Sequence, residues 1–483
     1  MDTQRILNEY EALFAPKTVA VVGASTKGTA LPNVFIRRIR EFGYEGTIYP
    51  IHPTAAEIDG LTAYKSLGAT PQPVDYAYIA IAAAQVPPLL AAGKGRVRFA
   101  QVISSGFGEV DEGKGLQEEL AIAAHAGGMR LLGPNCLGIY TPRGRVTFAE
   151  IGPRDVGHVG IISQSGGLGT DIIRRGLNRG LKYSGLITVG NCADLGPTDI
   201  LEYYLADPQT RVIGLYIETA KDGRRLFETL REARAQKPVV VLKGGLTQQG
   251  RAAAASHTGS LAGDERVWRA LARQTGCVLV ETLDQFIDVL LIFQALAPNA
   301  RKPTKRVVLF GNGGGTSVLA TDYFARLGLD VLPFERAAID ALAAMKLPPG
   351  TSITNPVDCP VGTLQQDDGR VAEKILDIIY GHGSPDALVM HLNLSAFVGR
   401  TKKEVLDNLV DAALRVQKHH PGKAHFVLVL RSDGEPTLEE RKREFRARAV
   451  ALGIPVYDEM ANAGHALCAL AAHERFVQTR STR

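Results

Sequence analysis

His257 is the residue of this chain whose surroundings best suit covalent chemistry. It lies in the segment Ser256-His257-Thr258-Gly259-Ser260, just ahead of a stretch with helical spacing. An imidazole flanked by hydroxyl groups and glycine can attack phosphorus and form a phosphohistidine. Taken alone, the segment also fits a solvated or structural loop histidine, so the assignment depends on other groups that act with His257.

A nucleophilic histidine needs a partner for its second ring nitrogen, because that contact fixes the tautomer. Glu218 is the candidate carboxylate, since it directly follows an apolar strand expected over Val212–Ile217. The carboxyl ends of parallel strands are where open α/β sheets bind ligands. We therefore predict that Glu218 orients His257.

A second group that suits phosphate is the turn Ser163-Gln164-Ser165-Gly166-Gly167. It follows a strand expected over His158–Ser163 and opens a helix expected to start near Leu168. Backbone N–H groups and the macrodipole at a helix N-terminus attract anions. Ser165, Gly166 and Gly167 are therefore the predicted phosphate-binding residues.

A glycine turn near the N-terminus offers a third anion site. The first expected strand ends in Val22-Gly23-Ala24-Ser25-Thr26-Lys27-Gly28. Such a turn leaves backbone N–H groups free, while Ser25 adds a hydroxyl and Lys27 a positive charge. A ligand with a diphosphate suits Gly23, Ser25 and Lys27. A tight turn without a ligand is the alternative.

The same turn departs from the nicotinamide dinucleotide fingerprint in two ways. That fingerprint requires G-x-G-x-x-G and an acidic residue after the second strand, which binds the ribose. Ser25 stands where the middle glycine should be, and the second strand ends in Tyr49-Pro50-Ile51-His52-Pro53 without an acidic residue. Both departures count against an NAD-dependent dehydrogenase.

Two further loops follow expected strands of the same N-terminal segment. One is Ser104-Ser105-Gly106-Phe107-Gly108-Glu109, and the other is Gly133-Pro134-Asn135-Cys136-Leu137-Gly138. With the Gly23 turn they place three loops at the carboxyl ends of parallel strands. This grouping favours a ligand site over three unrelated turns.

The elements that position these loops alternate between short apolar runs and helical patterns, which predicts an α/β protein with parallel sheets. Residues 10–150 are expected to form a doubly wound, Rossmann-like domain, and residues 155–298 and 304–483 two flavodoxin-like domains. The expected strands are Thr18–Gly23, Gly46–Pro50, Asp75–Ile81, Phe99–Ser104, Arg130–Leu132, His158–Ser163, Gly185–Val189, Val212–Ile217, Val239–Lys243, Val278–Val280, Val307–Gly311, Asp386–Leu392 and His425–Leu430. The expected helices include Asn33–Phe42, Leu116–Ala126, Leu226–Ala235, Arg266–Gln274 and Ala461–Phe476.

A polar, proline-bearing linker over 297–304 leads into the third domain. Its first strand ends in Gly311-Asn312-Gly313-Gly314-Gly315, which lacks the Gly-Lys-Ser/Thr of a Walker A motif. We interpret this loop as serving packing or subunit contact rather than nucleotide binding.

Composition excludes several other classes of protein. The net charge is only +5 over 483 residues, with basic and acidic residues interleaved, which does not favour nucleic-acid binding. The five cysteines form no C-x-x-C pair and the histidines no H-E-x-x-H, so neither a disulfide framework nor a metal site is expected. No apolar run reaches membrane-spanning length and no signal pattern is present, so a cytoplasmic protein is expected.

Taken in order, the motifs resemble those of the NDP-forming acyl-CoA synthetase superfamily, which includes ADP-forming acetyl-CoA synthetases and succinyl-CoA synthetase. Ser256–Ser260 is the most specific element and the glycine turn the least. The resemblance covers nearly the whole chain, including the third domain through Thr354-Asn355-Pro356-Val357-Asp358. The motifs that carry it are Val19–Ser25, Ile103–Glu109, Gly133–Gly138, Ser163–Gly167 and Ser256–Ser260.

The resemblance implies roles for these residues. In the family the first domain binds coenzyme A, and the second carries the phosphorylated histidine. Ser25 and Lys27 would then contact CoA phosphates, while Ser104, Ser105, Gly106, Phe107 and Asn135 would border the CoA thiol. Ser165, Gly166 and Gly167 would bind the phosphoryl group, His257 would carry it, and Glu218 would orient His257.

The resemblance also implies a partner. Acyl-CoA synthesis in this family requires an ATP-grasp domain that binds ATP or ADP and Mg²⁺, and no such module is recognisable in this chain. We therefore expect the α-type subunit of an acid–thiol ligase with a separate ATP-grasp β-type subunit, in a heterotetramer. The substrate would be a small carboxylic acid. The alternative is a non-catalytic CoA-binding regulatory protein.

Overall fold

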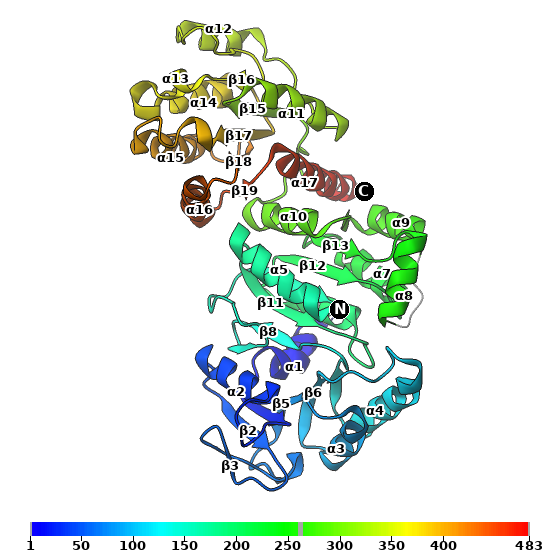
Figure 1. The fold of residues 1–483 in the computed structure, drawn as a ribbon. Helices are drawn as coiled ribbons and strands as arrows, with labels where there is room; N and C mark the ends of the chain where they lie inside the picture. The colour runs from blue at the N-terminus through cyan, green and yellow to red at the C-terminus, as the bar shows by residue number, and fades with distance from the viewer. Residues whose placement is uncertain (1, 259–263, 482–483) are drawn as a thin grey trace. The chain divides into compact units, whose positions relative to one another are not determined.

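The structure is a computed structural model that describes residues 2–258 and 264–481. It divides within helix α10 (Leu283–Ala295) into two compact units, Met1–Phe286 and Ile287–Arg483. The first unit contains a parallel sheet, a mixed sheet and a two-stranded antiparallel pair, and the second unit contains one parallel sheet (Figure 1). The α/β class expected from the sequence is confirmed.

The first sheet consists of five parallel strands in the order β2-β1-β5-β6-β7. Side chains of β1 alternate between its two faces, as a strand requires. Val19 and Val21 pack with Phe35 and Ile36 of α2, whereas Ala20 packs on the opposite face, which α3 and α4 cover (Figure 1). The elements are β1 (Thr18–Val22), α2 (Leu31–Glu41), β2 (Thr47–Ile51), β3 (Glu57–Ile58), β4 (Leu61–Thr62), β5 (Val74–Ile79), α3 (Val86–Ala92), β6 (Val97–Val102), α4 (Lys114–Ala126) and β7 (Arg130–Leu132).

The second sheet has the order β14-β13-β12-β10-β11-β8-β9. Its five parallel strands match the flavodoxin-like order, with the first strand beside the second and third. The sequence did not predict the two short antiparallel strands that extend its β11 edge, β8 (Ile139–Thr141) and β9 (Val146–Thr147). The other elements are β10 (Val159–Ser163), α5 (Gly166–Arg179), β11 (Tyr183–Thr188), α6 (Pro197–Ala206), β12 (Val212–Ile217), α7 (Gly223–Ala233), β13 (Val239–Lys243), α8 (Gln248–Thr258), α9 (Glu265–Thr275) and β14 (Val278–Val280).

An N-terminal helix, α1 (Thr3–Phe14), precedes the first strand and was also not predicted. The side chain of Asp2 caps it by accepting a hydrogen bond from the Arg5 amide at 3.2 Å. Leu13 and Phe14 of this helix are buried, and the Phe14 ring stacks on Tyr203 of α6 with 3.7 Å between ring centroids. Helix α1 thereby packs against an element of the second sheet, although the first sheet follows it in sequence.

The sheet of the second unit has the order β16-β15-β17-β18-β19, all parallel. This order matches the flavodoxin-like arrangement expected for this part of the chain. The elements are β15 (Val307–Gly311), α11 (Gly314–Arg326), α12 (Arg336–Ala344), β16 (Val357–Asp358), α13 (Val361–Leu364), α14 (Val371–His382), β17 (Ala387–Asn393), α15 (Lys403–His419), β18 (His425–Arg431), α16 (Pro436–Ala451), β19 (Val456–Tyr457) and α17 (Met460–Ser481).

The segment expected as a linker is fixed by one buried carboxylate of α17. Glu474 accepts hydrogen bonds from the backbone N–H groups of Asn299 and Thr304, at 2.7 and 2.6 Å. Its carboxylate also lies 2.9 Å from Nε2 of His425. Since the Glu474 side chain is fully buried, these contacts replace the water that the carboxylate loses on folding.

Among the described helices, none is both long enough and apolar enough to cross a membrane.

Candidate functional site

The turn between β10 and α5 has the geometry of an anion site. Ser165 is the N-cap of α5, and its Oγ accepts a hydrogen bond from the Leu168 amide at 3.3 Å. The Ser163 hydroxyl donates to the Ser165 carbonyl at 2.7 Å, which fixes the turn. Gly166 and Gly167 begin the helix, where the first backbone N–H groups have no partner within the helix. These residues lie where the sequence predicted a phosphate site.

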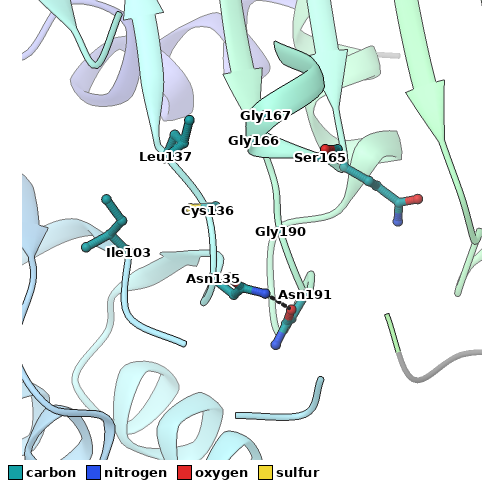
Figure 2. A pocket seen from close by; sticks show the side chains of 10 residues that line it. Ile103, Asn135, Cys136, Leu137, Ser165, Gly166, Gly167, Gly190 and Asn191 are labelled. Atoms are coloured by element: carbon teal, nitrogen blue, oxygen red, sulfur yellow. Dashed lines mark hydrogen bonds between the residues drawn. The ribbon is translucent and has the colours of Figure 1, made fainter. Parts of the chain in front are cut away.

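A cavity of about 230 Å³ lies at this helix end, within the first unit (Figure 2). We call it the first cavity. Loops from both sheets of the unit contribute to its wall, so the carboxyl ends of the two sheets face a common space. The lining residues are Ile103, Asn135, Cys136, Leu137, Gln164, Ser165, Gly166, Gly167, Gly190 and Asn191.

Leu137, in the wall of this cavity, leaves little room for a side chain at Gly166. A Cβ atom on Gly166 would lie 2.8 Å from Cγ of Leu137, closer than such atoms pack. A Cβ atom on Gly167 would meet nothing within 4 Å. The close approach at Gly166 therefore places the first turn of α5 against the loop that follows β7.

The loop after β7 presents Asn135 to the first cavity. Asn135 has a positive φ of 57°, a conformation that asparagine tolerates better than most residues. Its backbone N–H donates to the Ser104 carbonyl at 3.1 Å, and its side-chain amide donates to Oδ1 of Asn191 at 3.4 Å. In Figure 2 the side chains of Asn135 and Asn191 point toward one another.

The loop after β6 is held by a carboxylate that the sequence analysis did not assign. Oε1 of Glu109 accepts hydrogen bonds from the Gly106 and Phe107 amides, and Oε2 accepts one from Nδ2 of Asn191. Partial burial acts to raise the pKa of Glu109, but these hydrogen bonds outweigh it and lower the pKa below its ordinary value. The carboxylate therefore stays ionised and ties this loop to the loop after β11.

Predicted site residues in the β6 loop differ in what they can offer a ligand. Ser105 and Gly106 are exposed, whereas the Phe107 ring is fully buried in the core beneath α4. Ser104 donates its hydroxyl to the Ile81 carbonyl at 2.5 Å. Ser105 is thus the member of this group whose side chain faces solvent, while Phe107 serves packing.

The Gly23 turn is longer than a dinucleotide-binding turn, because α2 begins only at Leu31. Several of its amides already have partners: the Ser25 amide donates to Oδ1 of Asn33 at 2.7 Å, and the Lys27 amide donates to Oγ of Ser25 at 3.0 Å. The groups left for an anion include the Ser25 hydroxyl proton and the exposed Lys27 ammonium. Gly23 is required for packing, since a Cβ atom there would lie 2.3 Å from the Ala80 carbonyl oxygen.

Glu218 lies at the end of β12, as expected, and is only 4% exposed. Its Oε1 accepts a hydrogen bond from the Tyr216 hydroxyl at 2.9 Å. Its backbone carbonyl accepts one from Nζ of Lys243 at 2.7 Å, and its backbone N–H donates to Oε1 of Gln164. Because Gln164 belongs to the turn before α5, Glu218 is anchored directly to the predicted phosphate site.

Lys243 carries a lowered pKa beside this carboxylate. Burial lowers its pKa to about 8, although the nearby charge of Glu218 opposes the shift. The ammonium lies over the Trp268 ring, 5.6 Å from the ring centroid, which favours the charged form. Lys243 is a second residue near the predicted site that the sequence analysis did not assign.

The predicted nucleophile can be placed only by its backbone. Ser256, His257 and Thr258 form the end of α8, rather than a loop ahead of a helix as the sequence suggested. The His257 side chain, Gly259 and Ser260 lie outside the described residues. The pairing of His257 with Glu218 therefore stays a prediction.

Cys136 lines the first cavity but is not a nucleophile at neutral pH. Burial raises the pKa of its thiol to about 12, so the thiolate is scarcely populated. Within the described part of the chain, no group of three or more histidine, cysteine or acidic side chains is arranged to hold a metal ion.

Comparison with known proteins identifies the family. A CoA-binding domain model matches residues 17–142, and a model of the succinyl-CoA ligase-like flavodoxin domain matches residues 156–293. The α subunit of acetate–CoA ligase [ADP-forming] II from Pyrococcus furiosus is 34% identical over 450 residues, covering 91% of this chain and 96% of the relative. The chain belongs to the family of ADP-forming acyl-CoA synthetases.

Two further relatives show how much of this chain is matched and how much of each relative it covers. A solved structure of dinucleotide-forming acetyl-coenzyme A synthetase 1 from Ca. Korarchaeum cryptofilum, in complex with phosphate and ADP, is 30% identical. It covers 99% of both chains with a TM-score of 0.83. Acetate–CoA ligase [ADP-forming] I from Archaeoglobus fulgidus is 36% identical over 72% of this chain, but only half of that relative is covered.

This membership confirms the enzyme class expected from the sequence, an ADP-forming acyl-CoA ligase, and favours a catalytic subunit over a regulatory CoA-binding protein. It also supports coenzyme A as a ligand of the first domain. Asn191, Glu109 and Lys243 are residues near this ligase's site to which the sequence analysis gave no role, although Glu109 ends the motif Ile103–Glu109. Their only sequence signal is a position at a strand end: Lys243 is the last residue of an expected strand, and Asn191 and Glu109 follow expected strands within a short loop.

Proposed function

We propose that this chain is the CoA-binding and phosphate-transferring subunit of an ADP-forming acyl-CoA synthetase. The complete enzyme would interconvert acyl-CoA, ADP and phosphate with a carboxylic acid, CoA and ATP. The observation that carries the proposal is the first cavity, in which the start of α5 meets strand-end loops of the CoA-binding sheet.

The reaction would begin with phosphate bound at the N-terminus of α5 by Ser165, Gly166 and Gly167. A phosphate oxygen attacks the thioester carbonyl carbon, the C–S bond breaks, and CoA leaves as a thiolate that takes a proton. The backbone N–H groups at the helix end stabilise the negative charge that develops on the oxygens. The product that remains is an acyl phosphate.

In the second step the His257 imidazole attacks phosphorus, and the bond between phosphorus and the acyl oxygen breaks. The carboxylic acid leaves, and Glu218 stabilises the positive charge on the phosphorylated imidazole. The buried position of Glu218 and its anchoring through Gln164 support this role. An oxygen of ADP then takes the phosphoryl group from His257, which gives ATP.

CoA would lie along the carboxyl edge of the first sheet. The exposed Lys27 and the Ser25 hydroxyl suit its phosphates, and the Gly23 turn lets the chain pass close to β5. Ser104, Ser105, Gly106 and Asn135 would border the thiol end. Phe107 would support this loop by packing, since its ring is buried and its amide donates to Glu109.

The nucleotide step requires a partner, which we infer to be an ATP-grasp β-type subunit that binds ADP or ATP with Mg²⁺. Supporting this, one relative is named as an α subunit, and a relative whose name carries no subunit designation has about half its length outside the match. A heterotetramer would follow if two copies of each subunit assemble. The acid would be a small carboxylic acid.

The first experiment is intact-mass analysis of the chain after incubation with ATP, Mg²⁺ and a candidate ATP-grasp partner. We expect an acid-labile gain of one phosphoryl group that disappears in His257→Ala. His419→Ala is the matched control, because His419 is an exposed histidine at the end of α15 and should not affect the gain. A phosphoryl group retained in His257→Ala would refute the proposed carrier.

A further inference from the structure

A second cavity of about 240 Å³ adjoins the first cavity, also within the first unit. The two share Ile103 and Leu137, which therefore form the partition between them. Both residues are half-buried and line both cavities. The lining residues are Leu31, Phe35, Arg38, Tyr78, Ile103, Leu137, Phe148, Ala149, Glu150, Thr170 and Arg174.

The wall of the second cavity is mainly aromatic and aliphatic. Phe35 and Tyr78 stack on each other with 4.1 Å between ring centroids, and Phe148 and Ala149 lie in the same wall. Tyr78 is 98% buried by area, and its hydroxyl makes no hydrogen bond to any residue that the structure describes. A ligand here would find apolar surface with one polar group that lacks a protein partner.

The charged residues of this cavity are already paired with protein groups. The Arg38 guanidinium donates to the Phe148 carbonyl. Arg174 pairs with Glu150 at 3.2 Å, and both side chains are more than half exposed. Arg174 is thus compensated by a carboxylate, and the Arg38 guanidinium is held against a backbone carbonyl. Most of the remaining wall is apolar, so we expect apolar contact to decide what the cavity binds.

We propose that the second cavity receives the distal part of the acyl group, and that its substrate class is a carboxylic acid with a ring-sized apolar group, such as an aryl acid. This inference rests on the proposed function, because CoA must deliver the thioester to the first cavity. The acyl carbon would lie at the first cavity, and the ring would pass the partition into the second.

The position of the partition is set by the same contact that fixes the phosphate site. Leu137 packs where a Cβ atom on Gly166 would otherwise lie, so the first turn of α5 fixes this side chain. Leu137, which would limit the length of the acyl group, is therefore in contact with the turn that would bind phosphate. An acetyl group would end at Leu137, whereas a larger group would gain apolar contact beyond it.

The test is calorimetric titration of the chain with CoA, acetyl-CoA and phenylacetyl-CoA. Burying a phenyl ring in the second cavity should make phenylacetyl-CoA bind at least about tenfold more tightly than acetyl-CoA. Leu31→Trp, at an exposed position of the cavity rim, and Ala149→Leu, in its wall, should each remove this gain. Both should leave the acetyl-CoA affinity within about twofold.

Ile122→Trp is the matched control, since Ile122 is also an exposed apolar residue, lying on α4 outside the lining of either cavity. It should retain the gain. CoA binding without any gain for phenylacetyl-CoA, or a gain that persists in both Leu31→Trp and Ala149→Leu, would overturn this inference alone. Failure to bind CoA at all would overturn the proposed function and this inference with it.

Discussion

Oε2 of Glu109 accepts a hydrogen bond of 2.5 Å from the side-chain amide of Asn191. The two residues lie in loops that follow strands of different sheets, since Glu109 follows β6 and Asn191 follows β11. Asn191 also donates to Gln117 at 3.0 Å and accepts from Asn135 at 3.4 Å. One amide therefore holds together three loops around the first cavity.

Replacing this amide by a carboxylate should loosen the loops at neutral pH. Asn191→Asp places a second negative charge against Glu109, and a like-charged pair raises the pKa of one of its members. Leaving the side-chain oxygens of Glu109 and Gln117 without the donor of Asn191 costs about 1–3 kcal/mol. We therefore expect CoA affinity to fall about tenfold or more. Lowering the pH adds one proton to the pair, which supplies a donor between the two carboxyl groups and should restore affinity. Titration calorimetry at several pH values would show this.

The exposed Asn8→Asp on α1 is the control for the added charge and should keep wild-type affinity. The double variant Glu109→Gln with Asn191→Asp restores a donor opposite a carboxylate and should recover much of the loss. An Asn191→Asp affinity that is independent of pH would contradict the proposed positioning role.

Gly166 and Gly167 provide a matched pair for testing the phosphate site. In Gly166→Ala the new Cβ atom would displace Leu137 or the first turn of α5, whereas Gly167→Ala meets open space. Since small displacements of a binding group can cost orders of magnitude, we expect phosphoryl transfer to His257 to slow about tenfold or more in Gly166→Ala. A much smaller change is expected in Gly167→Ala. Equal losses in both variants would show that added bulk itself, rather than the Leu137 contact, matters.

The buried strands were the part of the fold that the sequence predicted best. The bounds predicted for β12 (Val212–Ile217), β13 (Val239–Lys243) and β15 (Val307–Gly311) agree with the structure residue by residue. Each is a short apolar run between turn residues, the pattern of a strand buried on both faces of a parallel sheet. Such a strand carries its signal locally, which is why no tertiary information was needed.

Elements whose role depends on distant partners were missed. Strands β8 and β9 have only three and two residues and join the second sheet, although they lie within residues 10–150, the segment expected to form the first domain. Glu109 and Asn191 are ordinary loop residues until two sheets bring them together. The Gly23 turn appeared to offer free amides, but the contact between Ser25 and Asn33 spans eight residues and is formed only when α2 packs.

Glu474 offers a stability test in the second unit. Hydrogen bonds from His425 and two backbone amides lower its pKa against the opposing effect of burial. Since its folded-state pKa is lowered, the carboxylate stabilises the protein above its ordinary pKa, and this contribution is lost as pH falls through the folded value. Glu474→Gln cannot satisfy the same donors and should destabilise the protein by about 1–3 kcal/mol at pH 7.

Differential scanning calorimetry between pH 7 and pH 3 would measure this effect. The exposed Glu440→Gln on α16 is the control and should leave the melting temperature nearly unchanged. The difference between Glu474→Gln and the wild type should shrink as the pH falls. A difference that stays constant down to pH 3 would rule out an ionised Glu474 as its source.

His391 tests the effect of a buried basic group on stability, in a higher pH range than Glu474. This residue of β17 is fully buried, with Nε2 3.2 Å from the Ser317 hydroxyl of α11, and Arg431 of β18 lies nearby. Burial, assisted by the charge of Arg431, lowers its pKa to about 4. Because the unfolded chain binds a proton at higher pH than the folded chain does, stability should fall as pH drops from about 6.5 towards 4.

Between pH 7.5 and pH 5 this single residue should cost about 2 kcal/mol of stability. His391→Gln removes the titrating group while keeping a polar side chain that can bind Ser317. The variant is expected to be less stable at pH 7.5, but its stability should decline less on acidification, by about the same 2 kcal/mol. Urea unfolding at both pH values would measure the two differences. Equal declines in variant and wild type would mean that His391 does not stay neutral in the folded protein at pH 5.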